Sequence, residues 1–222
     1  MRFLRALKRH NDREWFAEHK GVYEEAVKAP MLEIVARVND ALLEFAPEHV
    51  RPPHKAVMRI YRDIRFSKDK RPYKTRVSAW WARDGLEKTS GGGFYFEVSG
   101  HAVTIAAGAY MPERMQLLAI RQHIAARHED LRAVLANPQL RARYGMLEGA
   151  ALKRSPKGFE HCADAMDLLR CTQWGVSATA PTALAKQADI AQEIGRTFRI
   201  AAPLVTFLNA PLLPKVARKA VF

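Results

Sequence analysis

The spacing of apolar residues changes twice along this chain, and the change limits the folds open to it. In the first fifty residues apolar side chains recur at helical spacing, as in Leu32, Val35 and Val38. Over residues 57–111 the spacing becomes two, which is typical of strands that bury one face. Beyond this segment the helical spacing returns. Helices, then strands, then helices predict an α+β fold.

The predicted strands follow one another through short loops, which favours an antiparallel sheet. We expect strands over 58–66, 77–81, 94–98 and 103–110, with 174–178 as one more. A tight turn at Ser99-Gly100 would join two of them. The sequence therefore predicts one α+β domain over residues 3–213, with the sheet at about 57–111 packed by N-terminal and C-terminal helices. Residues 214–222 form a basic C-terminal tail. A helix is expected over Pro181–Ile200.

Positive charge is concentrated in one stretch. Residues 51–76 hold ten Lys and Arg against two Asp, in a chain whose formal net charge is +13. Tyr61, Phe66 and Tyr73 are interleaved with these charges. Basic residues clustered with aromatic ones indicate a surface that binds anions. A strand over 58–66 would place every second side chain about 6.6 Å apart on one face.

On such a face Arg59 and Arg65 would grip a phosphate or a carboxylate in a forked geometry. The residues predicted to bind an anion are Arg59, Tyr61, Arg65, Ser67, Lys68, Lys70, Tyr73 and Lys74. Asp63 and His19 are the candidate general bases. The alternative is structural, with Arg59, Asp63 and Arg65 forming an ion-pair network that ties the sheet to the N-terminal helices. Arg62 would then pair with an acid of the first helices, Asp12, Glu14 or Glu18.

Three stretches of the chain carry a family resemblance. They are NDREWFAEHKGVYEE at residues 11–25, RIYRDIRFSKDKRPYKT at 59–75, and PKGF at 156–159 followed by DLLR at 167–170. Together they resemble the family catalogued as domain of unknown function 2461, from roughly residue 3 to 212. Cys162-Ala163 stands where a His-Pro pair would be expected beside His161. The family has no established activity, so the resemblance implies the fold boundaries and the importance of 59–75 without implying a substrate.

Other chemistries find little support in the sequence. Cys162 and Cys171 are too few for a disulfide framework or a four-ligand zinc site, and the scattered histidines follow no metal-binding spacing. We therefore predict no metal and no cofactor. No apolar run approaches the roughly 20 residues of a membrane span, so we expect a cytoplasmic protein without membrane contact. Gly91-Gly92-Gly93 precedes a strand pattern rather than a helix, which predicts a flexible connection and not a phosphate loop.

Three functions remain open. A phosphorylated small molecule, for example a nucleotide or a sugar phosphate, would bind if the basic residues line a pocket. Nucleic acid would bind if they form an open face, with Tyr61 or Tyr73 stacking on bases. An acidic protein partner is the third possibility. The spacing of the charges in a sheet puts the small molecule slightly ahead.

Overall fold

The computed structural model describes residues 1–86 and 91–213. The predicted tail at 214–222 lies outside the described residues. The strands are β1 (Arg76–Ala82), β2 (Gly93–Ser99), β3 (Ala102–Ala109) and β4 (Trp174–Pro181). They form one antiparallel sheet in the order β1-β2-β3-β4. The α+β fold predicted from the sequence is confirmed.

Helices precede the sheet and follow its third strand. The helices are α1 (Arg2–Arg9), α2 (Arg13–Glu18), α3 (Lys20–Tyr23), α4 (Ala29–Leu42), α5 (Pro53–Ala56), α6 (Arg114–Ala136), α7 (Pro138–Tyr144), α8 (Met166–Leu169) and α9 (Ile190–Asn209). Single 3-10 or π turns lie at Glu24–Lys28, Pro47–His49, Ala163–Ala165, Thr182–Lys186 and Ala210–Leu212. The π turn makes α3 and α4 continuous.

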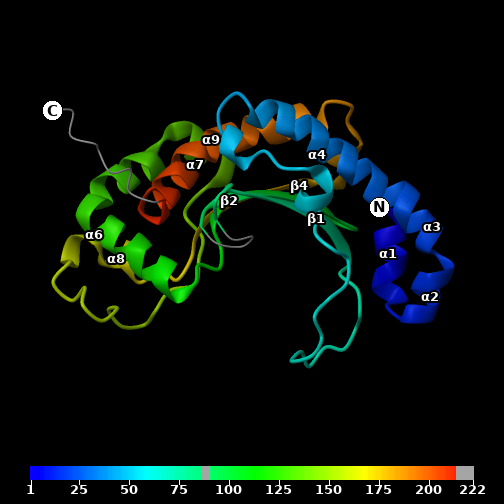
Figure 1. Cartoon of the computed structure of the whole chain (residues 1–222), viewed down its shortest axis with the longest axis horizontal. Helices are drawn as coiled ribbons and strands as arrows, with labels where there is room; N and C mark the ends of the chain where they lie inside the picture. The colour runs from blue at the N-terminus through cyan, green and yellow to red at the C-terminus, as the bar shows by residue number, and fades with distance from the viewer. Residues whose placement is uncertain (87–90, 214–222) are drawn as a thin grey trace.

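One face of the sheet is covered by α4 and α9, which cross above it in Figure 1. The apolar residues that α4 spaces at helical period, among them Val35, Val38 and Leu42, are fully buried there. On α9 the ring of Phe198 packs at 4.9 Å from Phe94 of β2. Burial of such side chains contributes most of the stabilisation of a fold of this size. The main core therefore lies between these two helices and the sheet.

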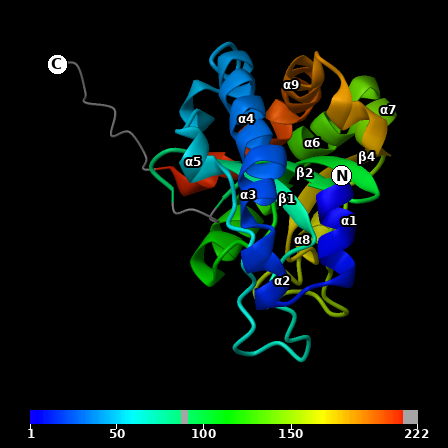
Figure 2. The same cartoon turned by 90° about the vertical axis from the view of Figure 1, so that its right-hand side faces the viewer.

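The other face of the sheet is left open, and the molecule curves around it. In Figure 1, α6 and α8 descend at one end of the sheet and α1 to α3 at the other, so that the molecule forms an arch. A long excursion between α5 and β1 projects downward beside the N-terminal helices, and Figure 2 shows it extending beyond them. This projecting segment contains most of the basic stretch at residues 51–76.

Two predicted boundaries need correction. The strand predicted over 58–66 is wrong, because the regular strand begins only at Arg76. The last long helix begins at Ile190 rather than Pro181, since Trp174–Pro181 is strand and a 3-10 turn intervenes. The turn at Ser99-Gly100 is confirmed, and Ser99 Oγ stabilises it by accepting from the Ala102 N–H at 3.0 Å.

Gly92 is held in place from the far end of the chain. Its N–H donates to Oδ1 of Asn209 at 2.7 Å, and its carbonyl accepts from Nδ2 of the same side chain at 3.0 Å. Asn209 is buried, 1% exposed. The flexible connection predicted for Gly91-Gly92-Gly93 is thus wrong for Gly92, which a buried side chain fixes on both sides.

Candidate anion-binding arm and sheet hollow

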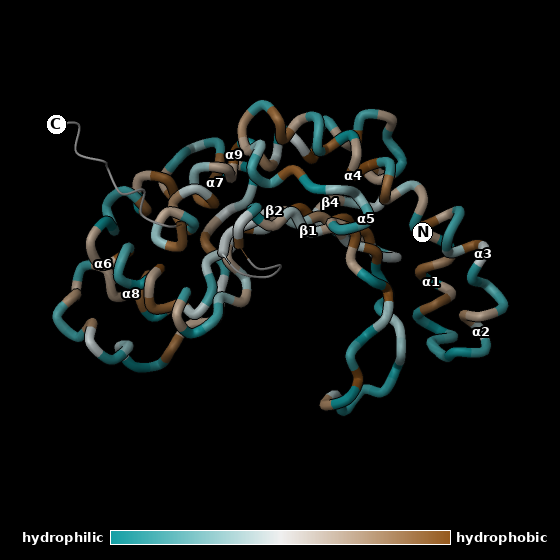
Figure 3. The backbone as a smooth tube through the Cα atoms, viewed as in Figure 1, coloured by the Kyte–Doolittle hydropathy of each residue, from teal (hydrophilic) through white to brown (hydrophobic). Residues whose placement is uncertain are grey.

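Residues 57–75 form an irregular antiparallel ribbon, here called the arm. Backbone bonds cross it at intervals: the Arg62 N–H donates to Pro72 O, and the Lys74 N–H donates to Ile60 O, both at 2.8 Å. Isolated bridges pair Tyr61 with Tyr73 and Val57 with Ala79. Most of the arm is hydrophilic along its length (Figure 3). It projects from the sheet as an extension of β1.

The base of the arm is fixed to the N-terminal helices by an aromatic cluster. The ring of Tyr73 stacks on Phe16 of α2, with centroids 4.1 Å apart. The side-chain amide of Asn11 bonds to the Tyr73 backbone as a neighbouring strand would. Its Oδ1 accepts from the Tyr73 N–H and its Nδ2 donates to the Tyr73 carbonyl, each at 3.0 Å. Ile60 is buried beside them. The family-like stretches at 11–25 and 59–75 thus meet in space.

Two equivalent local motifs hold the outer part of the arm in shape. Asp63 accepts from the backbone N–H of Arg65 at 3.2 Å and from its guanidinium at 3.0 and 2.7 Å. Asp69 accepts from Arg71 in the same way, at 3.1, 3.0 and 2.7 Å. Side-chain acceptors that bind a backbone N–H two residues on compete with the strand ladder. These motifs explain why the predicted strand does not form.

The same contacts decide the charge state of the two acids. The guanidinium of Arg65, and then its backbone N–H, lower the pKa of Asp63 from 3.8 to about 2. The corresponding groups of Arg71 lower the pKa of Asp69, with a smaller contribution from Arg62. Both carboxylates are therefore ionised and engaged at neutral pH. Asp63 is a weak proton acceptor in this state, which disfavours it as a general base.

The predicted partner of Arg62 is wrong. Its Nη1 lies 2.8 Å from Oδ2 of Asp69 and also donates to the Arg71 carbonyl at 3.0 Å. Its Nη2 reaches Ser67 Oγ at 3.5 Å. Arg62 therefore closes the arm on itself and does not pair with an acid of the first helices.

The remaining predicted cations lie on the outside of the arm. The exposed ones are Arg59, Arg65, Lys68 and Lys70, and Arg71, which was not among the predicted residues, is exposed as well. Phe66, between them, is 95% exposed. Within residues 1–86 and 91–213, no carboxylate lies at ion-pair distance from Arg59, Lys68 or Lys70. The guanidinium of Arg65 lies 5.8 Å from the centre of the Phe66 ring. The tip of the arm thus presents an aromatic ring to solvent on a segment that also carries exposed cations.

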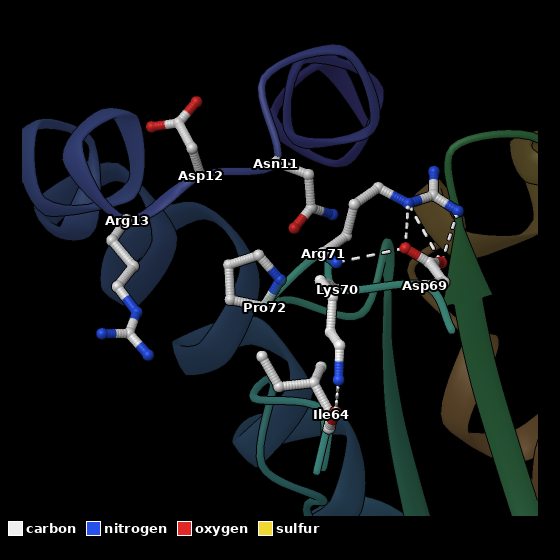
Figure 4. Close-up of a pocket in the computed structure, with 8 residues that line it drawn as sticks. All are labelled: Asn11, Asp12, Arg13, Ile64, Asp69, Lys70, Arg71 and Pro72. Carbon is white, nitrogen blue, oxygen red and sulfur yellow. Dashed lines mark hydrogen bonds and ion pairs between the residues drawn. The ribbon is translucent and has the colours of Figure 1, made fainter. Parts of the chain in front are cut away.

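A shallow hollow lies where the arm passes the start of α2. Figure 4 shows Arg13 on one side and Lys70 and Arg71 on the other, with Pro72 between them. Lys70 is held by its Nζ, which donates to the Ile64 carbonyl at 3.0 Å. The backbone carbonyl does not neutralise its charge. Asp12 and Asp69 line the same hollow, and Asp69 pairs with Arg71, so its three cations exceed its carboxylates by one charge.

The other predicted residues are dispersed. Tyr61 is half-exposed at the base of the arm, whereas Tyr73 is buried and its ring faces the core. Lys74 lies at the root of the arm, next to the sheet. His19 lies on the N-terminal helices, where its ring stacks on Trp15 at 4.1 Å and its Nδ1 donates to the Trp15 carbonyl at 2.8 Å. Nothing in these contacts aims His19 at the arm.

The open face of the sheet holds a second hollow, here called the sheet hollow. Its volume is about 560 Å³. The floor consists of alternate residues of the four strands: Ser78, Trp80, Tyr95, Glu97, Ala106 and Ser177. Lys74 and Arg76 line it at the β1 edge, and Glu148 and Gln173 line it near β4. Cavities of this size in proteins commonly hold small molecules.

A closed polar cluster occupies the β1 side of the floor. Glu97 accepts from the Tyr95 hydroxyl at 2.5 Å and pairs with Nε of Arg76 at 2.9 Å. Burial and then the bond to Glu97 raise the pKa of Tyr95, because both disfavour the phenolate. Tyr95 is therefore a neutral donor whose hydroxyl is already committed to Glu97.

The sequence prediction missed the sheet hollow entirely. One signal was present: Ser78 and Glu97 are polar residues at alternate positions of otherwise apolar strands, which indicates a second face that is not buried. The pairing of Trp80 with Tyr95, and of Ala106 with Ser177, depends on strand register and order. Spacing within one strand does not specify either.

Two further findings concern the described part of the chain. It contains no group of three or more His, Cys, Asp or Glu side chains placed to hold a metal ion. Nor does any helix in it combine the length and the apolar character that crossing a membrane requires.

The fold and the site define an α+β protein in which helices cover one face of an antiparallel sheet, while a basic arm and a hollow occupy the other. The chain belongs to the family of conserved hypothetical proteins DUF2461, whose profile matches residues 1–207. Neither the curated proteins nor the solved structures compared with it gave a match.

Proposed function

We propose that the protein binds nucleic acid through the arm, with the exposed cations contacting phosphates and Phe66 contacting a base. The observation that carries this proposal is the exposure of the arm. Its exposed cations and a ring that is 95% exposed share one projecting ribbon. A projecting basic ribbon can follow a phosphate backbone, and an exposed aromatic ring can stack on or wedge between bases.

A phosphorylated small molecule was slightly favoured by the sequence, and the geometry of the arm reverses that order. A small anion needs several donors around one point, whereas Arg59 and Arg65 lie on an irregular ribbon with Arg65 already paired to Asp63. The shallow hollow in Figure 4 is open to solvent. An extended polyanion uses such dispersed charges better, because each phosphate meets a different cation.

The test is fluorescence anisotropy of labelled single- and double-stranded oligonucleotides of about 20 nucleotides, which exceeds the site size of most single binding modules. The arm variant is Arg59→Ala/Lys68→Ala/Lys70→Ala, at the three cations that pair with no carboxylate of the described residues. The control is Lys153→Ala/Arg154→Ala/Lys157→Ala, which removes the same charge from an exposed loop. Titrations at low salt and at about 0.15 M salt separate contact from general attraction.

We expect wild-type binding to persist at the higher salt and the arm variant to lose it. The slope of log K against log salt should fall by about two to three in the arm variant, since each phosphate contact contributes about one. The control should keep both affinity and slope. Equal losses in the arm variant and the control, or no wild-type binding at the higher salt, would overturn the proposal.

A further inference from the structure

The sheet hollow is lined by residues that phosphate binding by the arm would not involve. It is lined from all four strands, and only Lys74 and Met58 of its lining belong to the arm. At about 560 Å³ it has the volume of a small-molecule site. What it would bind follows from its floor and from the charges at its two ends.

Small residues keep the centre of the floor low. Gly93, Gly108 and Gly175 pair with one another in a row across β2, β3 and β4. At Gly108, where φ is +130°, a Cβ would lie 2.1 Å from the Trp174 carbonyl oxygen. At Gly93 a Cβ would meet the ring of Trp80 at 2.6 Å, so this ring lies over the glycine. The Trp80 ring therefore forms part of a flat floor, and a planar ring can pack on such a surface.

One carboxylate in the hollow is available to a ligand. Among residues 1–86 and 91–213, the hydrogen-bond donor to the Glu148 carboxylate is the Ser177 hydroxyl alone, which lies 3.0 and 2.9 Å from its two oxygens. In the part of the chain that the structure describes, no Lys, Arg or His lies at ion-pair distance from it. Glu97, by contrast, is neutralised by Arg76. An ionised acceptor without a cation recognises N–H donors of a ligand.

Cations line the opposite edge of the hollow. Lys74 and Arg76 are at the β1 side, and Glu148 lies beside Ser177 of β4. Three inter-strand spacings separate β1 from β4, which is about 14 Å. The Glu97 carboxylate lies at the same edge, paired with Arg76, so two cations and one carboxylate leave one net positive charge there. The hollow thus offers an acceptor at one end, a net positive edge at the other and a flat region between them. A ligand that matches all three has a planar ring with amino groups and an anionic group about a nanometre away.

We propose that the sheet hollow is a nucleotide site that is distinct from the phosphate-binding surface of the arm. The base lies on the floor near Ala106, its amino group donates to Glu148, and its phosphate faces Lys74 and Arg76. Adenine, guanine and cytosine carry an amino group that donates to a carboxylate. Uracil presents a single ring N–H between two carbonyl oxygens, which repel the second carboxylate oxygen. The nucleotide can be free or part of a strand held by the arm.

The first experiment is calorimetric titration of the full chain with AMP, GMP, CMP, UMP and adenosine. We expect saturable binding of the three amino-bearing nucleotides, weaker binding of UMP, and weaker binding of adenosine than of AMP. Glu148→Gln should weaken AMP and CMP roughly tenfold or more and leave UMP nearly unchanged, because a charged acceptor is lost. The control Glu25→Gln changes an exposed acid elsewhere and should have no effect.

A second variant protects the test against misfolding and identifies the source of the nucleotide. Ala106→Phe should fill the floor and abolish binding while the unfolding temperature stays within a few degrees of wild type. If free nucleotides bind and the triple arm variant binds them equally well, the site takes free nucleotides whatever the fate of the arm proposal. If only oligonucleotides bind, and Ala106→Phe weakens them while the Lys153→Ala/Arg154→Ala/Lys157→Ala control does not, the strand supplies the nucleotide.

Two results would overturn the nucleotide site. One is the absence of any effect of Glu148→Gln and Ala106→Phe on both mononucleotides and oligonucleotides. The other is equal affinity of wild type for UMP and for the amino-bearing nucleotides, because the carboxylate would then play no part in recognition. Neither result bears on the salt dependence of the arm, so the two proposals fail separately.

Discussion

The base and the tip of the arm are held by different kinds of interaction. At the base, Ile60 and Tyr73 are 3% and 6% exposed, and the side chain of Asn11 bonds to both sides of the Tyr73 backbone. At the tip, Phe66 is 95% exposed. The contacts near it are local, such as Asp63 with Arg65 two residues away. The base depends on the rest of the fold, and the tip depends mainly on its own sequence.

This difference shows how a concentrated basic surface can exist on a stable protein. Like charges close together repel, and the repulsion would weaken any fold that buried them. Here the buried hydrophobic residues of the arm, Ile60 and Tyr73, lie where it meets the N-terminal helices, while most of its charge lies farther out in solvent. Substitutions at the two ends should therefore separate stability from binding.

The largest effect is expected from Phe16→Ala at the base. Phe16 is 3% exposed and contacts both Tyr61 and Tyr73. Its removal should lower the free energy of unfolding by about 3–5 kcal/mol, since buried aromatic residues cost this much when truncated. Urea denaturation measures the change. A loss below about 1 kcal/mol would mean that the base is not part of the cooperative core.

Asn11→Ala should have the next largest effect. It leaves the N–H and the carbonyl of Tyr73 without their partners, at a cost of about 1–3 kcal/mol. Hydrogen exchange of the Tyr73 amide should accelerate. Asn137→Ala is the matched control, because that Asn caps α7 through the N–H groups of Gln139 and Leu140. It should reduce stability by about 1 kcal/mol without a selective effect on the Tyr73 amide.

The sequence predicted the overall fold better than it predicted the arm. The change of apolar spacing from helical to two and back was enough for the α+β fold, because burial of one face imposes those periods. The strand over 58–66 failed because Asp63 and Asp69 bind backbone N–H groups two residues on. Alternation alone does not reveal this competition. The ion pair of Arg62 with Asp69 was not predicted either, because it requires the arm to turn back on itself.

The sheet hollow was beyond sequence reasoning for a topological reason. Glu148 follows α7 and Ser177 is in β4, while Trp80 and Ala106 are in the first and third strands. Their proximity requires β4 to pair with β3, in the register that sets Ala106 opposite Ser177. The residues predicted to bind an anion were easier to propose because they all lie in one short stretch, between Arg59 and Lys74. The exposure of its cations, which changed the proposed ligand, depends on the arm leaving the sheet.

Phe66→Ala at the tip truncates an exposed phenylalanine, whereas Phe16→Ala at the base truncates a buried one. The free energy of unfolding should change by less than about 0.5 kcal/mol, because an exposed side chain contributes little. The affinity for single-stranded oligonucleotide should fall about fivefold or more, as expected when one stacked base loses its aromatic partner. Phe66→Trp should retain the affinity. An unchanged affinity in Phe66→Ala would restrict the arm to phosphate contacts.

The smallest effect is the pH response of the tip. Folding lowers the pKa of Asp63 to about 2, mainly through the guanidinium of Arg65 and then its backbone N–H. A lowered pKa means that the ionised form stabilises the folded arm above pH 3.8, and that this contribution disappears as the pH falls toward 2. Carbon-13 titration of the Asp63 carboxyl should show the shift, and Arg65→Gln should move the midpoint back toward 3.8. Because both groups face solvent, the unfolding temperatures of wild type and Arg65→Gln should hardly differ between pH 3.8 and pH 2. A midpoint near 3.8 in wild type would show that the local motif does not persist in solution, and the tip would then be ordered only by its ligand.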